Sequence, residues 1–192
     1  MDYKVKSEKI VLDKFLKVFE AEVEHDTYRN EGKIQATRLA LDRGDSVAIL
    51  IYERDTDQFL FTEQFRYPSS RRNVPFILEL PAGAIDDGET AQDAAQREVL
   101  EEIGYKIDNL EKISTYFPSP GMSSEVIHLF FAQVETGDKV NNGGGAASEK
   151  EDIKLVPLSR KRALEKLPQG FFNNSITIIG LQWFLLNKEN LI

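Results

Sequence analysis

Hydrophobic and polar positions alternate in two stretches near the start of the chain. Residues 9–23 and about 33–41 each mix apolar side chains with charged ones, a pattern typical of strands. The polar segment 27–32 between them ends in a glycine and indicates a turn. Together they predict an antiparallel β-hairpin. Because a two-stranded piece is marginally stable alone, we expect it to pack on the main domain or on a second subunit.

Apolar runs in the rest of the chain predict a sheet flanked by helices. We expect strands at 46–52, 58–66, 76–80, 110–116, 125–135 and 153–158. We expect helices at 91–103, 161–167 and 175–187. For the first helix, Thr90 is the expected N-cap and Gly104 the expected C′ residue. This order predicts an α+β fold with a mixed sheet, divided into a hairpin region, 1–42, and a main domain, 43–192.

Composition then narrows the classes of function. A net charge of -8 argues against a nucleic-acid binder, which needs a basic face. The chain has no cysteine and two histidines, which excludes disulfides and thiolate metal sites. No apolar run approaches the roughly 18 residues of a membrane helix, and the first residues lack a signal-peptide core. We therefore expect a cytoplasmic protein with no membrane partner.

The segment 83–105 carries the chemistry. Glu98, Glu101 and Glu102 stand at i, i+3 and i+4 of the predicted helix, so their carboxylates share one face. Oxygen ligands that converge in this way suit Mg²⁺ or Mn²⁺. For an arbitrary Glu-x-x-Glu-Glu, the alternative is a solvated acidic helix face.

The longer spacing decides between these interpretations. The segment reads Gly-x5-Glu-x7-Arg-Glu-Val-x-Glu-Glu-x-Gly-Tyr, and seven fixed residues at fixed spacing arise by chance roughly once in 10⁸ start positions. It resembles the Nudix box, with every fixed position met. Val99 fills the first apolar position, whereas Tyr105, which is bulky and less apolar, fills the second.

The resemblance implies a loop–helix–loop that holds divalent cations, Mg²⁺ with Mn²⁺ as a possible substitute, against a diphosphate. By position, Glu98 and Glu102 resemble direct metal ligands. Glu101 resembles a ligand of an additional ion or a partner of the ligands. The carbonyl of Ala82 is similar to one that binds metal in some members of the family.

The remaining positions of the box look structural. Arg97 is expected to orient a glutamate, and Glu89 to brace the loop, for example by pairing with Arg97. Gly83 and Gly104 are interpreted as backbone positions.

Segments that flank the box resemble one branch of the family. Ser119-Pro120-Gly121, Gln64-Phe65-Arg66 and the run 78–83 look like the ADP-ribose pyrophosphatase branch. Gly143-Gly144-Gly145 followed by 149–153 is similar to bacterial GDP-mannose hydrolases and to ADP-ribose enzymes. The resemblance covers most of the chain from about residue 38 onward.

Residues outside the box are candidates for proton transfer and substrate binding. In this branch the base comes from the loop at 149–152, and position matching favours Glu149, with Glu151 second. Arg66 suits a diphosphate contact, because its fork fits phosphate oxygens; Arg38 is a second candidate. Glu125 can accept from a sugar hydroxyl, and its alternative is a surface acid at a strand start.

The resemblance as a whole implies a Nudix α/β/α sandwich with an N-terminal β-hairpin used in a homodimer. The expected reaction is hydrolysis of a nucleoside diphosphate sugar, with ADP-ribose first and GDP-mannose or a broad range next. One alternative is a housecleaning hydrolase of nucleotides or dinucleotides. Another is a non-catalytic nucleotide-sugar sensor, against which the complete set of box glutamates argues.

Overall fold

The protein divides into two compact units. The structure, a computed structural model, describes residues 1–29 and 32–191. The first unit joins residues 1–45 to the segment 117–126, and the second joins 46–116 to 127–191. The domain boundary between residues 42 and 43 stays a prediction.

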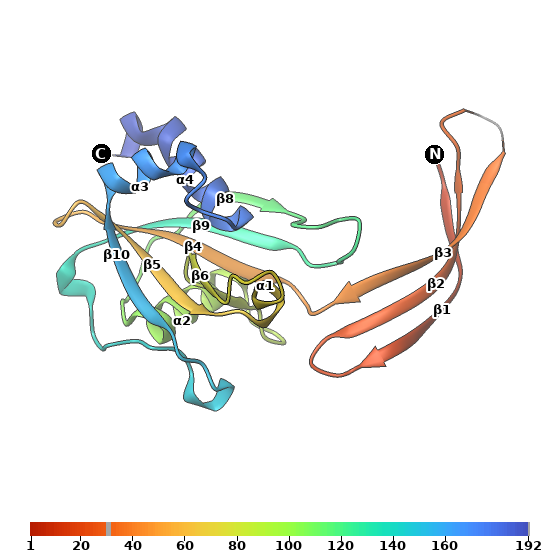
Figure 1. The fold of residues 1–192 in the computed structure, drawn as a ribbon, viewed down its shortest axis with the longest axis horizontal. Coiled ribbons are helices and arrows are strands. Elements are labelled where there is room, and N and C mark those ends of the chain that lie inside the picture. The colour runs from red at the N-terminus through yellow and green to blue at the C-terminus, as the bar shows by residue number, and fades with distance from the viewer. Residues whose placement is uncertain (30–31, 192) are drawn as a thin grey trace. The chain divides into compact units, whose positions relative to one another are not determined.

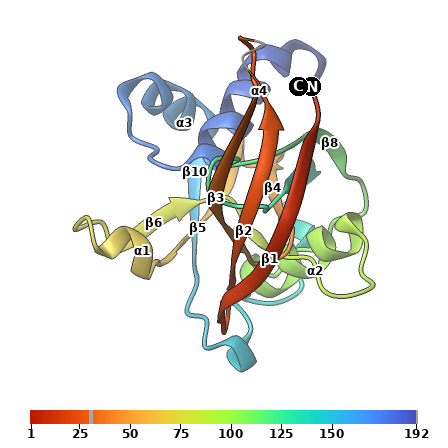
Figure 2. The ribbon, with the colours of Figure 1, turned by 90° about the vertical axis from the view of Figure 1, so that its right-hand side faces the viewer.

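The first unit is built on a three-stranded antiparallel sheet in the order β1-β2-β3 (Figure 2). Its strands are β1 (Tyr3–Asp13), β2 (Lys17–Asp26) and β3 (Lys33–Asp42). The predicted hairpin is present as β2 and β3. A single strand over 9–23 is wrong, because the chain turns at 14–16 between β1 and β2. Of the turn predicted at 27–32, Asn30 and Glu31 lie outside the described residues.

The second unit contains a seven-stranded mixed sheet. Its main path runs β10-β5-β4-β9-β8, with β6 paired to β5 and β7 paired to β4. The pair β4–β9 is parallel, and the others are antiparallel. The strands are β4 (Ser46–Glu53), β5 (Gln58–Phe65), β6 (Phe76–Glu79), β7 (Ala82–Ala84), β8 (Glu111–Tyr116), β9 (Ile127–Val134) and β10 (Lys154–Ser159).

Helices cover both faces of this sheet (Figure 1). On one face lies α2 (Ala91–Ile103), and on the other lie α3 (Arg160–Lys166) and α4 (Ser175–Leu191). Shorter pieces are α1 (Tyr67–Ser70) and the 3₁₀ turns at Thr136–Asp138, Ala147–Glu149 and Leu167–Gln169. The predicted α/β/α arrangement is therefore confirmed. Among the described residues, no helix is long and apolar enough to cross a membrane.

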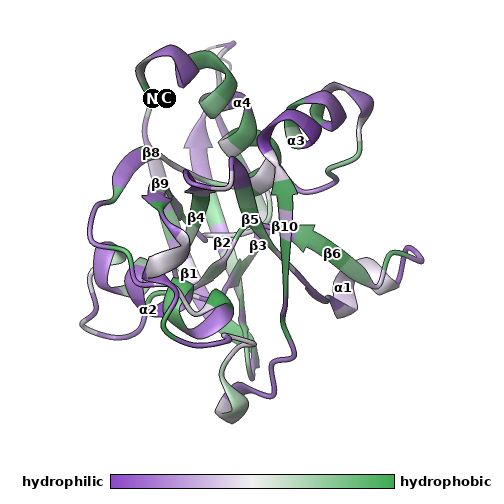
Figure 3. Ribbon diagram, turned by 90° about the vertical axis from the view of Figure 1, so that its left-hand side faces the viewer, coloured by the Kyte–Doolittle hydropathy of each residue, from purple (hydrophilic) through white to green (hydrophobic). Residues whose placement is uncertain are grey.

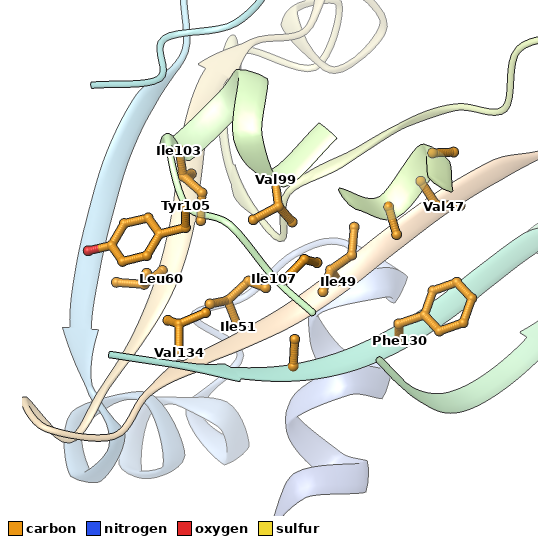
Figure 4. Close-up of a cluster of buried hydrophobic side chains, with 13 residues drawn as sticks. Val47, Ile49, Ile51, Leu60, Val99, Ile103, Tyr105, Ile107, Phe130 and Val134 are labelled. Atoms are coloured by element: carbon orange, nitrogen blue, oxygen red, sulfur yellow. The ribbon is translucent and has the colours of Figure 1, made fainter. Parts of the chain in front are cut away.

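Alternate residues of the central strands build two apolar layers. Val99 and Ile103 of α2 point toward Ile49 and Ile51 of β4 (Figure 4). The opposite layer holds Phe184 of α4 with its neighbours on β4, β5 and β9. Figure 3 shows hydrophobic residues along β5, β6 and β10, whereas much of α3 is hydrophilic. This packing fixes α2 against the sheet.

Both ends of α2 are closed as predicted. The Thr90 hydroxyl oxygen accepts a hydrogen bond from the Asp93 N–H at 3.2 Å. Gly104 adopts a left-handed conformation, with φ 78°, and its N–H donates to the last turn of the helix. Next to it, the Tyr105 hydroxyl donates to the buried Glu53 carboxylate at 2.6 Å. Tyr105 thus keeps its ring in the core and has a partner for its polar end.

Candidate functional site

The three glutamates of α2 are not equally exposed. Glu98 and Glu102 are only 7% and 1% exposed, whereas the side chain of Glu101 is 38% exposed. A solvated acidic face would leave all three in water. Two of them instead point into the protein, against β7 and the segment that leads into it. Buried carboxylates at this spacing indicate a site rather than a surface.

Glu102 lies deepest. One carboxylate oxygen, Oε2, accepts a hydrogen bond from the Ala82 N–H at 3.2 Å. The other, Oε1, is buried, and among the described residues it has no hydrogen-bond partner. Burial raises the pKa of Glu102 well above its usual range, and the Glu98 carboxylate raises it further. This side chain therefore favours a cation or a proton.

Glu98 shares its charge with a neighbouring cation. Its Oε1 accepts a hydrogen bond from Nη1 of Arg97 at 2.6 Å. Burial raises the pKa of Glu98 to about 6, while Arg97 opposes the shift and Glu101 adds to it. The same Nη1 of Arg97 lies 3.3 Å from Oε2 of Glu101. One guanidinium thus neutralises part of the helix face.

Arg97 also ties the preceding loop to the helix. Its Nε and Nη2 donate to the two carboxylate oxygens of Glu89, at 3.0 and 2.9 Å. Nη2 donates as well to the Ala84 carbonyl at 2.9 Å. Glu89 in turn accepts from the Asp86 N–H at 3.2 Å. The ion pair between Glu89 and Arg97 that the sequence suggested is present, and it fastens the loop over 84–89.

Gly83 leaves the space into which Glu98 reaches. A Cβ atom at this position would lie 1.9 Å from Oε1 of Glu98 and 2.5 Å from its Oε2. Any larger residue must therefore push the carboxylate away. The glycine is required by close approach and not by an unusual backbone angle, since its φ lies outside the left-handed region.

The glycine run 143–145, far along the chain, binds the C-terminal end of α2. The N–H groups of Gly144 and Gly145 donate to the carbonyls of Glu102 and Glu101, at 2.9 and 3.0 Å. A Cβ at Gly143, whose φ is 63°, would lie 2.4 Å from the Glu102 carbonyl oxygen. Backbone contact this close satisfies helix carbonyls that otherwise lack partners.

This contact brings one acid of the following loop to the helix. Oε2 of Glu151 accepts a hydrogen bond from the Ala146 N–H at 3.0 Å, and its charge raises the pKa values of Glu98 and Glu102. Glu149 lies two residues earlier in a 3₁₀ turn and is exposed. The structure thus groups Glu151 with the helix glutamates and leaves Glu149 at the rim of the loop.

Arg66 follows β5, and it is held by a residue that the sequence did not single out for a role. Its Nε and Nη2 both lie 2.8 Å from Oε1 of Glu79, the last residue of β6. The Glu79 charge also acts on Glu102, so this pair belongs to the same neighbourhood. The register of β6 against β5 puts the Glu79 side chain on the side of the sheet that α2 covers. The sequence does not give this register, so it does not predict the contact with Arg66.

The other two predicted substrate residues lie in the first unit. Arg38 of β3 lines a cavity of about 550 Å³ together with the segment 117–124. Apolar side chains of Leu39, Phe117 and Met122 contribute to its wall. The Glu125 carboxylate lies 3.8 Å from Nε of Arg43.

The donor set fits a hard divalent cation. Carboxylate oxygens of Glu98, Glu102 and Glu151 gather at one end of α2, and Glu102 offers a buried oxygen without a hydrogen bond from the described chain. Within residues 1–29 and 32–191, no three acidic or histidine side chains form a finished chelating group. Since Arg97 holds Glu98, cation binding requires these side chains to rearrange.

Comparison with known proteins gives a consistent picture. A model of the NUDIX domain matches residues 42–172. An ADP-ribose pyrophosphatase of Haemophilus influenzae is 32% identical over 195 residues, covering 99% of this chain and 89% of that protein. A GDP-mannose pyrophosphatase of Cronobacter sakazakii is 32% identical, covering 83% and 84%. An ADP-ribose pyrophosphatase of Escherichia coli K12 is 28% identical, covering 87% and 80%.

Replacing Gly83 tests the contact with Glu98. Gly83→Ala should weaken Mg²⁺ binding by about 10- to 100-fold, the usual cost of disturbing a residue that supports a metal ligand. The physical reason is that the new methyl group takes the place of the Glu98 carboxylate. Affinity is measured by titration calorimetry, and circular dichroism checks the fold. Gly137→Ala is the control, because no atom lies within 4 Å of its added Cβ. Unchanged Mg²⁺ affinity in Gly83→Ala would contradict this account.

Proposed function

The chain belongs to the Nudix family of hydrolases, and from that premise we propose that it hydrolyses nucleoside diphosphate sugars with Mg²⁺. It is a Nudix pyrophosphohydrolase. The proposed reaction adds water across the pyrophosphate bond, giving a nucleoside monophosphate and a sugar phosphate. ADP-ribose is the first substrate, and GDP-mannose is the next. The observation that carries the proposal is the buried pair Glu98 and Glu102, joined by Glu151.

The proposed metal site uses oxygen donors from three segments. Glu98 and Glu102 hold Mg²⁺ or its substitute Mn²⁺, with the Ala82 carbonyl beside them and Glu101 serving an additional ion. Glu151 joins this set, because its charge already acts on both buried glutamates. When bound, the cation neutralises charge on the diphosphate and lowers the pKa of the attacking water.

The chain's own residues then complete the chemistry. Glu149 accepts one proton of the attacking water. The water oxygen then bonds to phosphorus while the bridging P–O bond breaks. We assign this task to Glu149 and not to Glu151, because Glu151 is bound by the Ala146 N–H and its charge acts on Glu98 and Glu102, whereas Glu149 is exposed on the same loop. Arg66 donates to oxygens of the diphosphate and offsets their charge.

Arg38 and Glu125 of the first unit are proposed as substrate-binding residues. The cavity beside Arg38 combines apolar walls with a cation and the hydroxyl-bearing Ser123 and Ser124. Such a lining suits a base or sugar that carries a phosphate. Glu125, on the same segment, accepts hydrogen bonds from sugar hydroxyls.

The first expected result concerns substrate class. With Mg²⁺, ADP-ribose and GDP-mannose should be hydrolysed faster than other nucleotide sugars or nucleoside triphosphates, scored as phosphate released after phosphatase treatment. Glu102→Gln, purified in parallel, should lose nearly all activity and keep its fold, because a buried metal ligand is neutralised. Turnover confined to nucleoside triphosphates would refute the proposed substrate class.

The second expected result separates the two acids of the loop. Glu149→Gln should lower kcat by about 10²- to 10⁴-fold and leave the Mg²⁺ concentration for half-maximal rate unchanged. Glu151→Gln should raise that Mg²⁺ concentration, because a cation donor is lost. Both are read from Mg²⁺ titrations of the steady-state rate. If the two variants show the opposite pattern, the roles of Glu149 and Glu151 must be exchanged.

We also propose that the chain forms a homodimer through the sheet of the first unit. Strand register separates a polar face, which holds ion pairs such as Lys9–Glu20 and Lys6–Glu24, from an apolar face. The mainly apolar face carries Tyr3, Val5, Ile10, Phe19, Val23 and Ile34, with Glu8 and Arg38 in the middle of it. Tyr3 is 79% exposed, and an apolar face on a three-stranded sheet matches the interface of a second copy.

Light scattering tests the dimer directly. The wild-type chain should give twice the mass of 21.8 kDa, and Val5→Lys with Ile10→Lys should give the monomer mass, because two charges enter the apolar face. Thr37→Lys is the matched control on the polar face of the same sheet. A wild-type monomer at working concentrations that hydrolyses substrate at full rate would sink the proposal.

A further inference from the structure

We propose that Glu79 is a positioning residue that aims the Arg66 guanidinium at the diphosphate. The inference rests on the proposed function, in which Arg66 contacts the phosphates, and adds a residue to which no role has been given so far. Glu79 acts through Arg66 and does not itself touch the substrate.

In this ion pair Glu79 is the buried partner and Arg66 is the more exposed one. The Glu79 side chain is 12% exposed, whereas the Arg66 side chain is 40% exposed. Oε1 of Glu79 receives both Nε and Nη2 of Arg66, at 2.8 Å each. Among the described residues, Nη1 of Arg66 has no hydrogen-bond partner. The buried acid thus holds one edge of the guanidinium and leaves a donor for phosphate oxygens.

Strand pairing puts this pair on the same face of the sheet as α2. Glu79 lies opposite Thr62 in the β5–β6 register, and Leu60, two residues before Thr62, packs in the apolar layer of α2. The Glu79 charge is also among those that raise the pKa of Glu102, in keeping with this placement. Arg66 is therefore held beside the proposed metal site.

The backbone that carries Glu79 is itself anchored. Nδ2 of Asn174 donates to the carbonyl of Leu78 at 2.9 Å, and its Oδ1 accepts from the Thr177 N–H at 3.0 Å. Asn174 thereby ties β6 to the first turn of α4. A carboxylate on an anchored strand is a better reference point for a flexible arginine than one on a loop.

Burial makes the pair sensitive to loss of charge. Desolvation raises the pKa of Glu79, and hydrogen bonds from Arg66 and Gln64 pull it back. A neutral amide in place of the acid keeps the shape but holds the guanidinium less firmly. Arg66 then samples more rotamers, and fewer of them point at the phosphates.

A double-mutant cycle tests the proposal. KM and kcat are measured with ADP-ribose for wild type, Glu79→Gln, Arg66→Ala and the double variant, and binding of ADP-ribose without divalent cation is measured by calorimetry. Glu79→Gln should raise KM and the dissociation constant by about tenfold. In the Arg66→Ala background the same change should add less than twofold. Glu63→Gln, on the neighbouring strand β5 and paired with Lys154 at 3.2 Å, is the control and should change neither.

Other outcomes overturn the inference. Equal effects of Glu79→Gln with and without Arg66 would show that it acts elsewhere, and so would a shifted Mg²⁺ midpoint with normal KM. A normal KM and dissociation constant in a folded variant would show that Glu79 has no such role. If Glu79→Gln melts early, Glu79→Asp takes its place, and it should restore part of the affinity only when Arg66 is present.

Failure of the proposed function has a different signature. A wild-type chain that binds ADP-ribose but does not hydrolyse it refutes the reaction, while the calorimetric cycle still tests the positioning of Arg66. A wild-type chain that does not bind ADP-ribose overturns both.

Discussion

The second unit must accommodate two buried carboxylates that lie next to one another, and several of its contacts depend on them. Glu98 and Glu102 lie one helical turn apart with little access to water, and an unpaired buried charge costs several kcal/mol. The surrounding contacts each reduce that cost. Arg97 donates to Glu98, the Ala82 N–H donates to Glu102, and Gly83 leaves the space that the Glu98 carboxylate occupies. Folding thus supplies the energy that brings the two carboxylates together, and a cation bound there would replace part of this support once Arg97 releases Glu98.

Apolar packing keeps that arrangement in place. The side of α2 next to its buried acids contributes Val99 and Ile103 to the layer against β4, so the helix cannot turn without exposing core. The exposed parts of the site are Glu149, the proposed base, and the end of Arg66, the proposed diphosphate contact. The proposed metal ligands and the proposed substrate contacts therefore come from different elements, as expected when a site must hold an ion and also admit a ligand.

Much of this could be read from the sequence, and the failures have physical causes. The box spacing identified α2 and its caps because Thr90, Gly104 and the glutamates have local requirements. The turn at 14–16 was missed because it contains neither glycine nor proline, and β7 because its three residues form no apolar run. The clasp of Glu79 on Arg66 depends on strand register, and the closure of α2 by Gly144 joins residues about forty positions apart. Contacts of that kind are set by tertiary structure.

The contact of Gly144 and Gly145 with α2 also determines how much of the chain must be synthesised before the site can form. The helix that carries the proposed metal ligands ends at Ile103, yet the N–H groups that satisfy its final carbonyls belong to Gly144 and Gly145, and β6 is fastened by Asn174 at the start of α4. A ribosome that has released the whole Nudix box has therefore made the glutamates proposed to bind metal, but not the contacts that close their helix. Until the last third of the chain emerges, the C-terminal end of that helix lacks those partners, and a prematurely terminated product carries the signature sequence without them.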